Sequence, residues 1–236
     1  MSANAELLQR SGPMESSAQE IPLPRPPVTR QSNDWNPEEF AREQIRSLVR
    51  RVFFASGAHP VRQVVICATE PHTAVGKICD QVGRALALET HADVAVVARD
   101  RASLEMSAVH DGCRGSGEIK SWATQTSTNL WQVPEWLMRL RGEEAGTGRY
   151  WLSRLTELRR VFEYTVIQGP AAGISSEAGL LGQLADGLIL VLDAGSTRRA
   201  TARKIKEVLE GAQTRILGTV LSQRKFPVPE KIYRRL

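Results

Sequence analysis

The stretch that decides the fold is VVICATEPHTAVGKI, residues 64–78. It opens with an apolar run, 64–68, that is rich in β-branched side chains, and such a run predicts a buried strand. A polar turn follows, and the residues from Cys79 to Leu88 then show the apolar spacing of a helix. A strand, a loop that ends in Gly-Lys and a helix make up the frame of a phosphate-binding P-loop.

The loop keeps half of the complete motif, G-x-x-x-x-G-K-[ST]. In that motif, backbone N–H groups surround phosphate oxygens, the lysine reaches the outer phosphates and the hydroxyl binds magnesium. Gly76 and Lys77 match it, but Pro71 takes the place of the first glycine and has no N–H to donate. Ile78 takes the place of the hydroxyl residue and cannot bind a metal. The candidates for phosphate or nucleotide binding are Thr73, Ala74, Val75, Gly76, Lys77 and Ile78.

Composition and charge describe a globular chain with a basic surface. The chain has 236 residues, 42% of them hydrophobic, and can bury one core of ordinary size. The net charge of +5 makes an anionic partner plausible, but the arginines are scattered through the expected helices as well as clustered, so we expect a solvated basic surface. We expect no nucleic-acid partner, because Glu135, Glu143 and Glu144 lie among the tryptophans that could stack on bases. Cys67, Cys79 and Cys113 lack metal-ligand spacing, which predicts reduced thiols without a metal or a disulfide. Neither a leader peptide nor a membrane span is recognisable, so we expect a cytoplasmic protein.

The N-terminal segment, residues 1–33, differs in composition from the rest of the chain and is rich in Ser, Pro, Gln and Glu. It cannot bury enough apolar surface to offset its ordering entropy, so we predict a disordered tail. A proline-rich ligand for a partner module, at residues 21–27, is the alternative. Residues 34–236 are expected to form one domain that opens with a helix capped by Asp34 or Asn36.

Apolar strands alternate with amphipathic helices through this domain. After the first strand, we expect strands at 94–98, 130–133, 164–167, 187–192 and 216–221, the last of them in the core. The expected helices are 36–57, 79–90, 135–141, 150–162, 176–184, 197–210 and 230–236, and 111–129 is expected to be a loop with one helical turn. This alternation predicts an α/β fold, a doubly wound and mostly parallel sheet with helices on both faces.

Several stretches beyond the Gly-Lys loop share one pattern: EQIRSLV (43–49), FEYTVIQGP (162–170), ADGLILV (185–191), GTVLS (218–222) and FPVPEKIY (226–233). Together they resemble the cytoplasmic P-loop domains of bacterial tyrosine kinases that govern capsule and exopolysaccharide synthesis, relatives of the deviant-Walker MinD/ParA ATPases. The resemblance runs from about Glu38 to the C-terminus. It implies a P-loop NTPase-like fold and ATP or ADP as the cofactor.

This chain departs from that family at the positions with a chemical role. Where the resemblance implies a magnesium ligand or an acidic residue, this chain has Ile78, Ala98 and Gln168. Phosphoryl transfer depends on bound magnesium, and a neutral amide is a poorer ligand for it than a carboxylate. Asp100 remains, either as a residual catalytic acid or as a helix cap, and Ser222 replaces an adenine-contacting asparagine. We therefore expect no catalytic residues and no metal, and any ATP or ADP to bind with weak or no magnesium dependence.

Other residues bear on partners. The resemblance implies a helix that contacts a neighbouring subunit, and Glu43 and Arg46 retain half of its contact residues. Self-association is therefore one prediction, and an ion pair within the helix is the alternative. The basic residues at 224–235 could face acidic lipid or a partner's acidic segment. Tyr233 stands alone where the family has a tyrosine cluster.

The leading hypothesis is a non-catalytic regulatory or scaffold protein of exopolysaccharide or capsule synthesis. It would dock to a membrane polysaccharide co-polymerase or a sister kinase and lie at the inner face of the cell membrane through that partner. Two alternatives remain open. One is an active ATP-dependent autokinase or ATPase that uses Asp100. The other is a MinD/ParA-like positioning factor on membrane or DNA.

Overall fold

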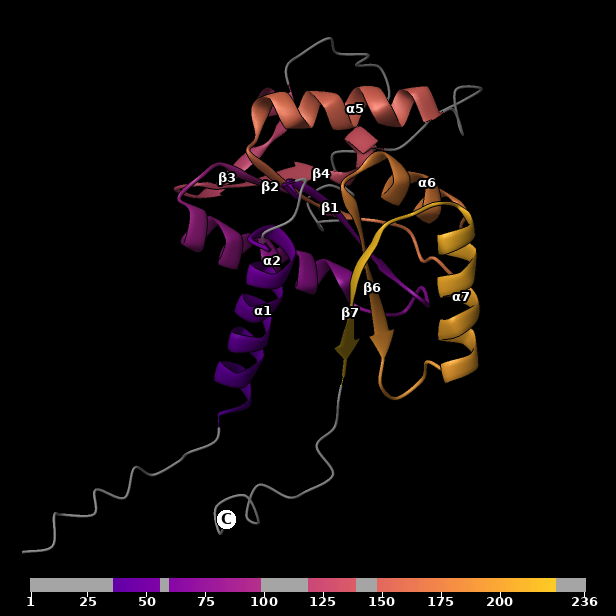
Figure 1. Ribbon diagram of the computed structural model, residues 1–236. Coiled ribbons are helices and arrows are strands. Elements are labelled where there is room, and N and C mark those ends of the chain that lie inside the picture. Colours follow the sequence, from indigo (N-terminus) through magenta and orange to yellow (C-terminus); the bar gives the residue numbers. More distant parts are fainter. Residues whose placement is uncertain (1–35, 56–59, 99–118, 139–147, 224–236) are drawn as a thin grey trace, which may run out of the picture. The chain divides into compact units, whose positions relative to one another are not determined.

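A sheet with helices on both faces forms the described part of the chain (Figure 1). The structure is a computed structural model and describes residues 36–55, 60–98, 119–138 and 148–223. All of them belong to one contact unit, Trp35–Leu236. The predicted N-terminal tail, Asp100 and the basic C-terminus with Tyr233 lie outside the described residues.

Within the described residues the sheet has seven strands, in the order β3-β4-β2-β5-β1-β6-β7. Every neighbouring pair is parallel except β3 and β4, which form an antiparallel pair at one edge. The prediction of a mostly parallel α/β sheet is therefore confirmed. The strands are β1 (Gln63–Ala68), β2 (Val94–Ala98), β3 (Thr124–Ser127), β4 (Leu130–Pro134), β5 (Tyr164–Gln168), β6 (Gly187–Asp193) and β7 (Ile216–Ser222).

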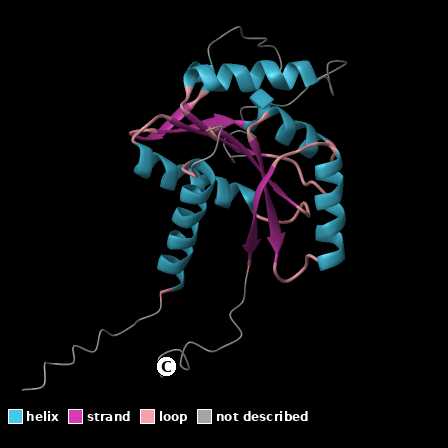
Figure 2. Cartoon of the chain, in the orientation of Figure 1, coloured by secondary structure: helices cyan, strands magenta, loops and turns pink. Residues whose placement is uncertain are grey.

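The helices divide into two layers, one on each face of the sheet (Figure 2). Side chains alternate between the faces of a strand, so Val64 and Ile66 face α1 and α2, whereas Val65 and Cys67 face the opposite layer. Each layer thus covers one apolar core. The helices are α1 (Pro37–Phe53), α2 (Val75–Thr90), α4 (Ile119–Trp122), the 3₁₀ helix η1 (Glu135–Met138), α5 (Gly148–Val161), α6 (Glu177–Leu184) and α7 (Arg199–Gly211).

The start of α1 follows from its sequence. The side chain of Asn36 accepts a hydrogen bond of 3.0 Å from the backbone N–H of Glu38, and Pro37 occupies the first turn. An unpaired N–H at a helix start is satisfied by such a cap, and proline loses nothing there because it has no N–H. Of the two predicted caps, Asn36 is confirmed. No helix in the described ranges is both long and apolar enough to cross a membrane.

Three elements differ from the sequence-based expectations. Helix α2 begins at Val75, four residues before the predicted start. Strand β3 lies within 111–129, which was expected to be a loop; its residues are all exposed, so no alternation of apolar side chains marks it. Strand β7 was expected in the core, but among the described strands it pairs only with β6, at the sheet edge, and its residues are half-buried or exposed. The apolar run at 216–221 therefore predicted the strand correctly but overestimated its burial.

A polar network joins β1, α5 and the start of β6 at the amino ends of the strands. The carboxylate of Asp186 accepts hydrogen bonds from the backbone N–H groups of Arg62 and Gln63, at 2.8 and 2.7 Å. It also accepts one from the guanidinium of Arg159 at 2.7 Å. The buried Gln63 side chain accepts from Arg159 at 2.7 Å and donates to the carbonyl of Leu155 at 2.8 Å. This network joins α5 to the amino ends of β1 and β6, at the opposite end of the strands from the P-loop frame.

Candidate functional site

The P-loop frame lies between the end of β1 and the start of α2. Thr73 and Val75 are buried, whereas Ala74 and Lys77 are exposed. The backbone N–H of Thr73 donates to the carbonyl of Glu70 at 3.4 Å, and that of Val75 donates to the carbonyl of Thr73 at 2.8 Å. A complete P-loop turns such N–H groups toward a phosphate. Two donors of this loop are instead engaged within the loop itself.

A cleft of about 500 Å³ opens beside this loop. The predicted residues from Thr73 to Lys77 all line it, so the structure brings five of the six candidate positions together. Ala98 and Gln168, from the ends of β2 and β5, line it as well. Among the described residues, the charged side chains of the lining are those of Lys77, Asp80 and Arg84.

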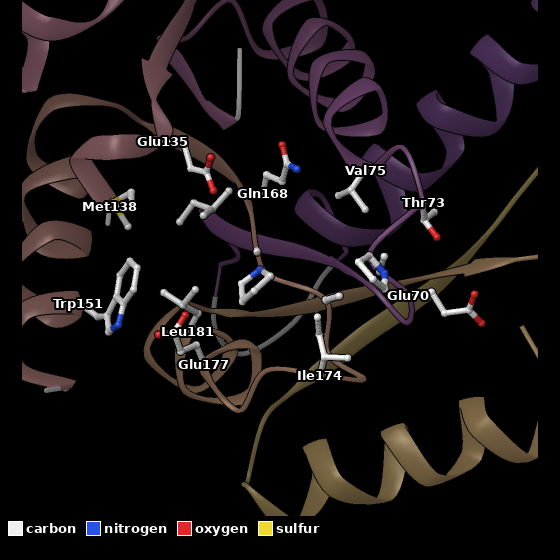
Figure 3. A pocket seen from close by; sticks show the side chains of 16 residues that line it. Glu70, Thr73, Val75, Glu135, Met138, Trp151, Gln168, Ile174, Glu177 and Leu181 are labelled. Atoms are coloured by element: carbon white, nitrogen blue, oxygen red, sulfur yellow. The ribbon is translucent and has the colours of Figure 1, made fainter. Parts of the chain in front are cut away.

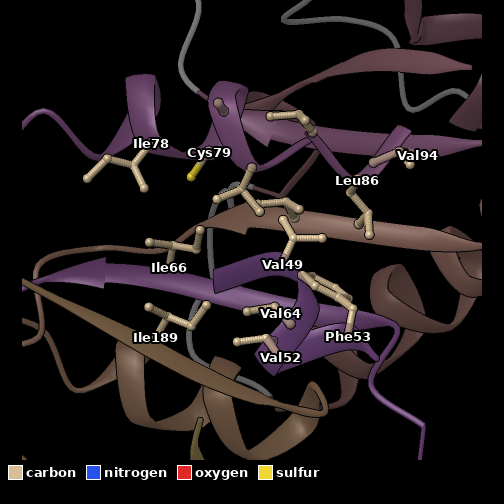
Figure 4. Close-up of a cluster of buried hydrophobic side chains, with 14 of the residues drawn as sticks. Val49, Val52, Phe53, Val64, Ile66, Ile78, Cys79, Leu86, Val94 and Ile189 are labelled. Atoms are coloured by element: carbon tan, nitrogen blue, oxygen red, sulfur yellow. The ribbon is translucent and has the colours of Figure 1, made fainter. Parts of the chain in front are cut away.

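The sixth candidate, Ile78, is turned away from this cleft. Its side chain is 8% exposed and belongs to the apolar core between the sheet and helices α1 and α2 (Figure 4). Ala98, which the resemblance places at a second acidic position, is 2% exposed and packs in the same core. Both side chains contribute to the packing of the domain and neither offers an oxygen atom.

Gln168 occupies the last position of β5, next to the P-loop frame (Figure 3). A Cβ atom placed on Gly76 would lie 3.2 Å from its side-chain oxygen Oε1. The amide therefore rests directly against the first turn of α2, where the backbone of Gly76 leaves room for it. The structure thus places the third altered position beside the Gly-Lys loop.

A second cavity, of about 480 Å³, lies between the carboxyl ends of β1 and β5 and the elements η1, α5 and α6 (Figure 3). Its lining shares Thr73, Val75 and Gln168 with the P-loop region. The remainder combines apolar side chains, Trp151 among them, with the carboxylates of three glutamates. Sequence reasoning did not single out these glutamates as a site, since they are far apart in the chain and no motif links them. They are Glu70, Glu135 and Glu177.

The remaining predicted residues lie elsewhere. Glu43 and Arg46 form an exposed ion pair of 3.6 Å within α1, which is the alternative expected for them. A contact of these residues with a second subunit remains a prediction. Ser222 ends β7, where its carbonyl accepts from the N–H of Ala194 at 2.9 Å, and it does not line the cleft. In the part of the chain that the structure describes, no group of three His, Cys, Asp or Glu residues could hold a metal ion.

Two cysteines lie near the P-loop frame, and both are buried. Burial raises the pKa of Cys67 to about 12 and raises that of Cys79 as well, the nearby charge of Asp80 adding to the effect. A thiol is nucleophilic only as its thiolate. Neither cysteine is therefore a candidate nucleophile.

Comparison with known proteins agrees with this geometry. Over 74 residues the chain is 30% identical to the tyrosine-protein kinase CpsD of Streptococcus agalactiae, and over 77 residues it is 29% identical to the tyrosine-protein kinase YwqD of Bacillus subtilis. The chain is a relative of the bacterial tyrosine kinases. The matched stretch spans about a third of the length of these curated relatives, 32% in each case. No family model matches the chain.

Solved structures show the same fold for this tyrosine-kinase relative. The chimerical protein CapA2B2 has a TM-score of 0.63 at 16% identity, covering 78% of this chain and 85% of that one. The kinase domain of VpsO has a TM-score of 0.56 at 16% identity and covers 80% of this chain and 98% of its own. MinD from Aquifex aeolicus has a TM-score of 0.53 at 16% identity over 74% and 73%. The predicted family resemblance and P-loop NTPase-like fold are thereby confirmed.

Proposed function

We propose that this tyrosine-kinase relative is a non-catalytic protein of exopolysaccharide or capsule synthesis that acts by binding a partner. One observation carries the proposal. Of the three positions where the family resemblance implies oxygen ligands or acids, two are held by core side chains, Ile78 and Ala98, and the third by the amide of Gln168 against Gly76.

The chemistry of phosphoryl transfer explains why these positions matter. Magnesium neutralises the charge that develops on the phosphates, and it takes oxygen ligands in a near-octahedral shell. The apolar packing of Ile78 and Ala98 supplies none of these ligands. The internal hydrogen bonds of the Thr73 and Val75 N–H groups add to the argument, because they leave fewer donors for phosphate oxygens.

Nucleotide titration tests the catalytic half of the proposal. Calorimetry is carried out with ATP and with ADP, each with and without magnesium. We expect magnesium to change the nucleotide affinity by less than about threefold, because a tenfold change would require the bound metal to contribute ~1.4 kcal/mol to the binding free energy. Phosphate release and autophosphorylation are expected at the background rate. Magnesium-dependent turnover that disappears in Lys77→Ala would refute the proposal and establish the protein as a working ATPase or kinase.

A restored site provides the positive control. The triple variant Ile78→Ser, Ala98→Asp and Gln168→Asp returns the three oxygen-bearing side chains. Its Ser and Asp at core positions carry the cost of burying polar groups, so its folding is checked by circular dichroism before nucleotide is added. Magnesium-dependent ATP binding in this variant and not in the parent would assign the loss to these three positions.

The docking half of the proposal concerns a membrane polysaccharide co-polymerase or a sister kinase. It is supported by the sequence relation to CpsD and YwqD and by the fold shared with CapA2B2. Co-expression with the co-polymerase of the same organism is expected to move the protein into the membrane fraction, at its inner face. A protein that stays in the supernatant at low salt with both the co-polymerase and the sister kinase present would contradict docking.

A further inference from the structure

Strand β7 forms one edge of the described sheet, beside β6 (Figure 1). No described strand pairs with its outer edge. Charged residues make up 24% of the chain, yet the seven residues of β7, ILGTVLS, include no charged residue and no proline. Proteins usually protect an exposed edge with charges, prolines or very short strands, because its free N–H and C=O groups can pair with another chain. Strand β7 lacks these protections.

The opposite edge of the described sheet is different. Strand β3 has four residues, all of them polar and exposed, and its pairing with β4 shifts register between Gln125 and Ser127. Such a short and irregular strand is a poor template for a further strand. The pairing of β7 with β6, in contrast, is regular from Gly218 to Ser222. The edge that is suited to pairing is therefore that of β7.

The backbone of β7 identifies the groups that point outward. The C=O of Ser222 accepts a hydrogen bond of 2.9 Å from the N–H of Ala194, so it faces β6. The backbone groups of alternate residues point to opposite edges of a strand, so Thr219 and Leu221 direct theirs away from β6. The side chains of both residues are exposed, and Leu221 is 55% exposed. A Cβ atom on Gly218 would meet no described atom within 4 Å, so an incoming strand also finds room for its side chains.

The sequence of β7 is suited to pairing with itself. With a two-fold axis at Val220, two antiparallel copies of β7 place Thr219 of one copy opposite Leu221 of the other. Each of these pairs can exchange both N–H···O bonds, and the exposed Leu221 side chain covers the opposite threonine. No charged side chain lies within 216–222, so the paired strands bring no like charges together there.

We propose that two copies of this chain associate through the outer edges of their β7 strands, in this antiparallel register. The surface is distinct from that of Glu43 and Arg46 on α1, and the proposal goes beyond the docking role above without depending on it. One pair of short strands buries less area than the ~1,200 Å² of a stable interface, so we expect a weak dimer, with a dissociation constant of about 10–100 µM.

Sedimentation-velocity ultracentrifugation of the full-length chain, without nucleotide, tests the proposal over about 1–300 µM, a range that spans the expected dissociation constant. Leu221→Lys places a charge at the edge and should weaken the dimer by at least about tenfold. Val208→Lys is the matched control, because it changes an apolar residue of similar exposure, 60%, on α7. It should change the dissociation constant by less than about twofold. Circular dichroism checks that both variants fold.

The salt dependence provides a second readout. The paired strands are uncharged and each copy carries a net charge of +5, so raising the salt concentration screens only repulsion between the copies. The dimer should therefore persist or become tighter between about 20 and 200 mM salt. A dimer that dissociates as the salt concentration rises would contradict pairing through this strand.

A cysteine at the two-fold axis tests the register. Opposite residues of a non-hydrogen-bonded antiparallel pair have Cα atoms about 4.5 Å apart, which a disulfide can span. In a Cys113→Ser background, Val220→Cys should form a disulfide-linked dimer under mild oxidation, whereas Val208→Cys should not.

A chain that stays monomeric over the whole concentration range would overturn the proposal, whatever covers the edge instead. So would an equal loss of the dimer in Leu221→Lys and Val208→Lys, a dimer lost in Glu43→Ala and kept in Leu221→Lys, or equal cross-linking of the two cysteine variants. Failure to dimerise would leave the docking and nucleotide experiments unaffected. Magnesium-dependent turnover would refute the non-catalytic role without removing the dimer.

Discussion

Replacing Asp186 with alanine is expected to destabilise the domain by about 2–4 kcal/mol. The carboxylate accepts from two backbone N–H groups, of Arg62 and Gln63, and from the Arg159 guanidinium. The Gln63 N–H belongs to a residue that is 1% exposed, and a hydrogen bond from a buried donor to a charged acceptor contributes about 1.5–3 kcal/mol. Arg62 is exposed and the Arg159 side chain is 41% exposed, so water replaces much of those two bonds, and each adds at most about 1 kcal/mol.

Urea denaturation at about 25 °C, with the free energy of unfolding extrapolated to water, measures this loss. Asp193→Ala is the matched control at the other end of the β6 segment, because its carboxylate accepts from one N–H, that of the exposed Gly195 at 2.8 Å. We expect the control to cost less than about 1 kcal/mol. If Asp186→Ala were no more costly than Asp193→Ala, the reasoning that this network holds α5 to the sheet would be wrong.

Two further perturbations follow from packing and burial. A Cβ atom on Gly83 would lie 2.2 Å from a methyl group of Val96, so Gly83→Ala should lower the free energy of unfolding by about 1–3 kcal/mol in the same urea assay. A Cβ atom on Gly211 would meet no described atom within 4 Å, so Gly211→Ala should leave the free energy of unfolding unchanged or raise it by up to about 1 kcal/mol. In the folded protein, Cys67 and Cys79 should resist alkylation by iodoacetamide at about pH 8, and both should react in urea. Mass spectrometry of a variant in which Cys113 is replaced by serine measures this labelling. Rapid labelling of either cysteine in the native state would contradict their burial. Folding raises the pKa of both thiols, so their contribution to stability is intact below the unfolded pKa of about 8.5 and decreases as the pH rises above it. A free energy of unfolding that rises with pH above about 8.5 in the parent, relative to the double serine variant, would contradict the shift.

Local sequence predicted most of the fold because most strands and helices carry the apolar spacing typical of their own type of structure. The apolar run at 64–68 and the helix after Gly76 carry their own patterns, and Asn36 marks the start of α1. The expected strands at 94–98 and 187–192 are likewise present as β2 and β6. These features depend on neighbours in the chain, so the chain alone specifies them.

The sequence failed where the outcome depends on residues that are distant in the chain. Strand β3 exists because its polar residues pair with β4. Strand β7 is only partly buried because no described strand pairs with its outer edge. An apolar run reports that a strand forms, but its place in the sheet order decides how much of it is buried. The predicted core position of β7 holds only in part for this reason: none of its residues is fully buried, although Ile216, Leu217 and Val220 pack against the two cores.

By itself, the sequence determined that a P-loop frame without its first glycine or its hydroxyl stands at the head of an α/β domain. The tertiary structure alone decided that Ile78 packs in the core, that Gln168 rests on Gly76, and that Glu70, Glu135, Glu177 and Trp151 share one cavity. The physical reason is that the carboxyl ends of parallel strands meet at one edge of the sheet, which brings together side chains that no local pattern connects.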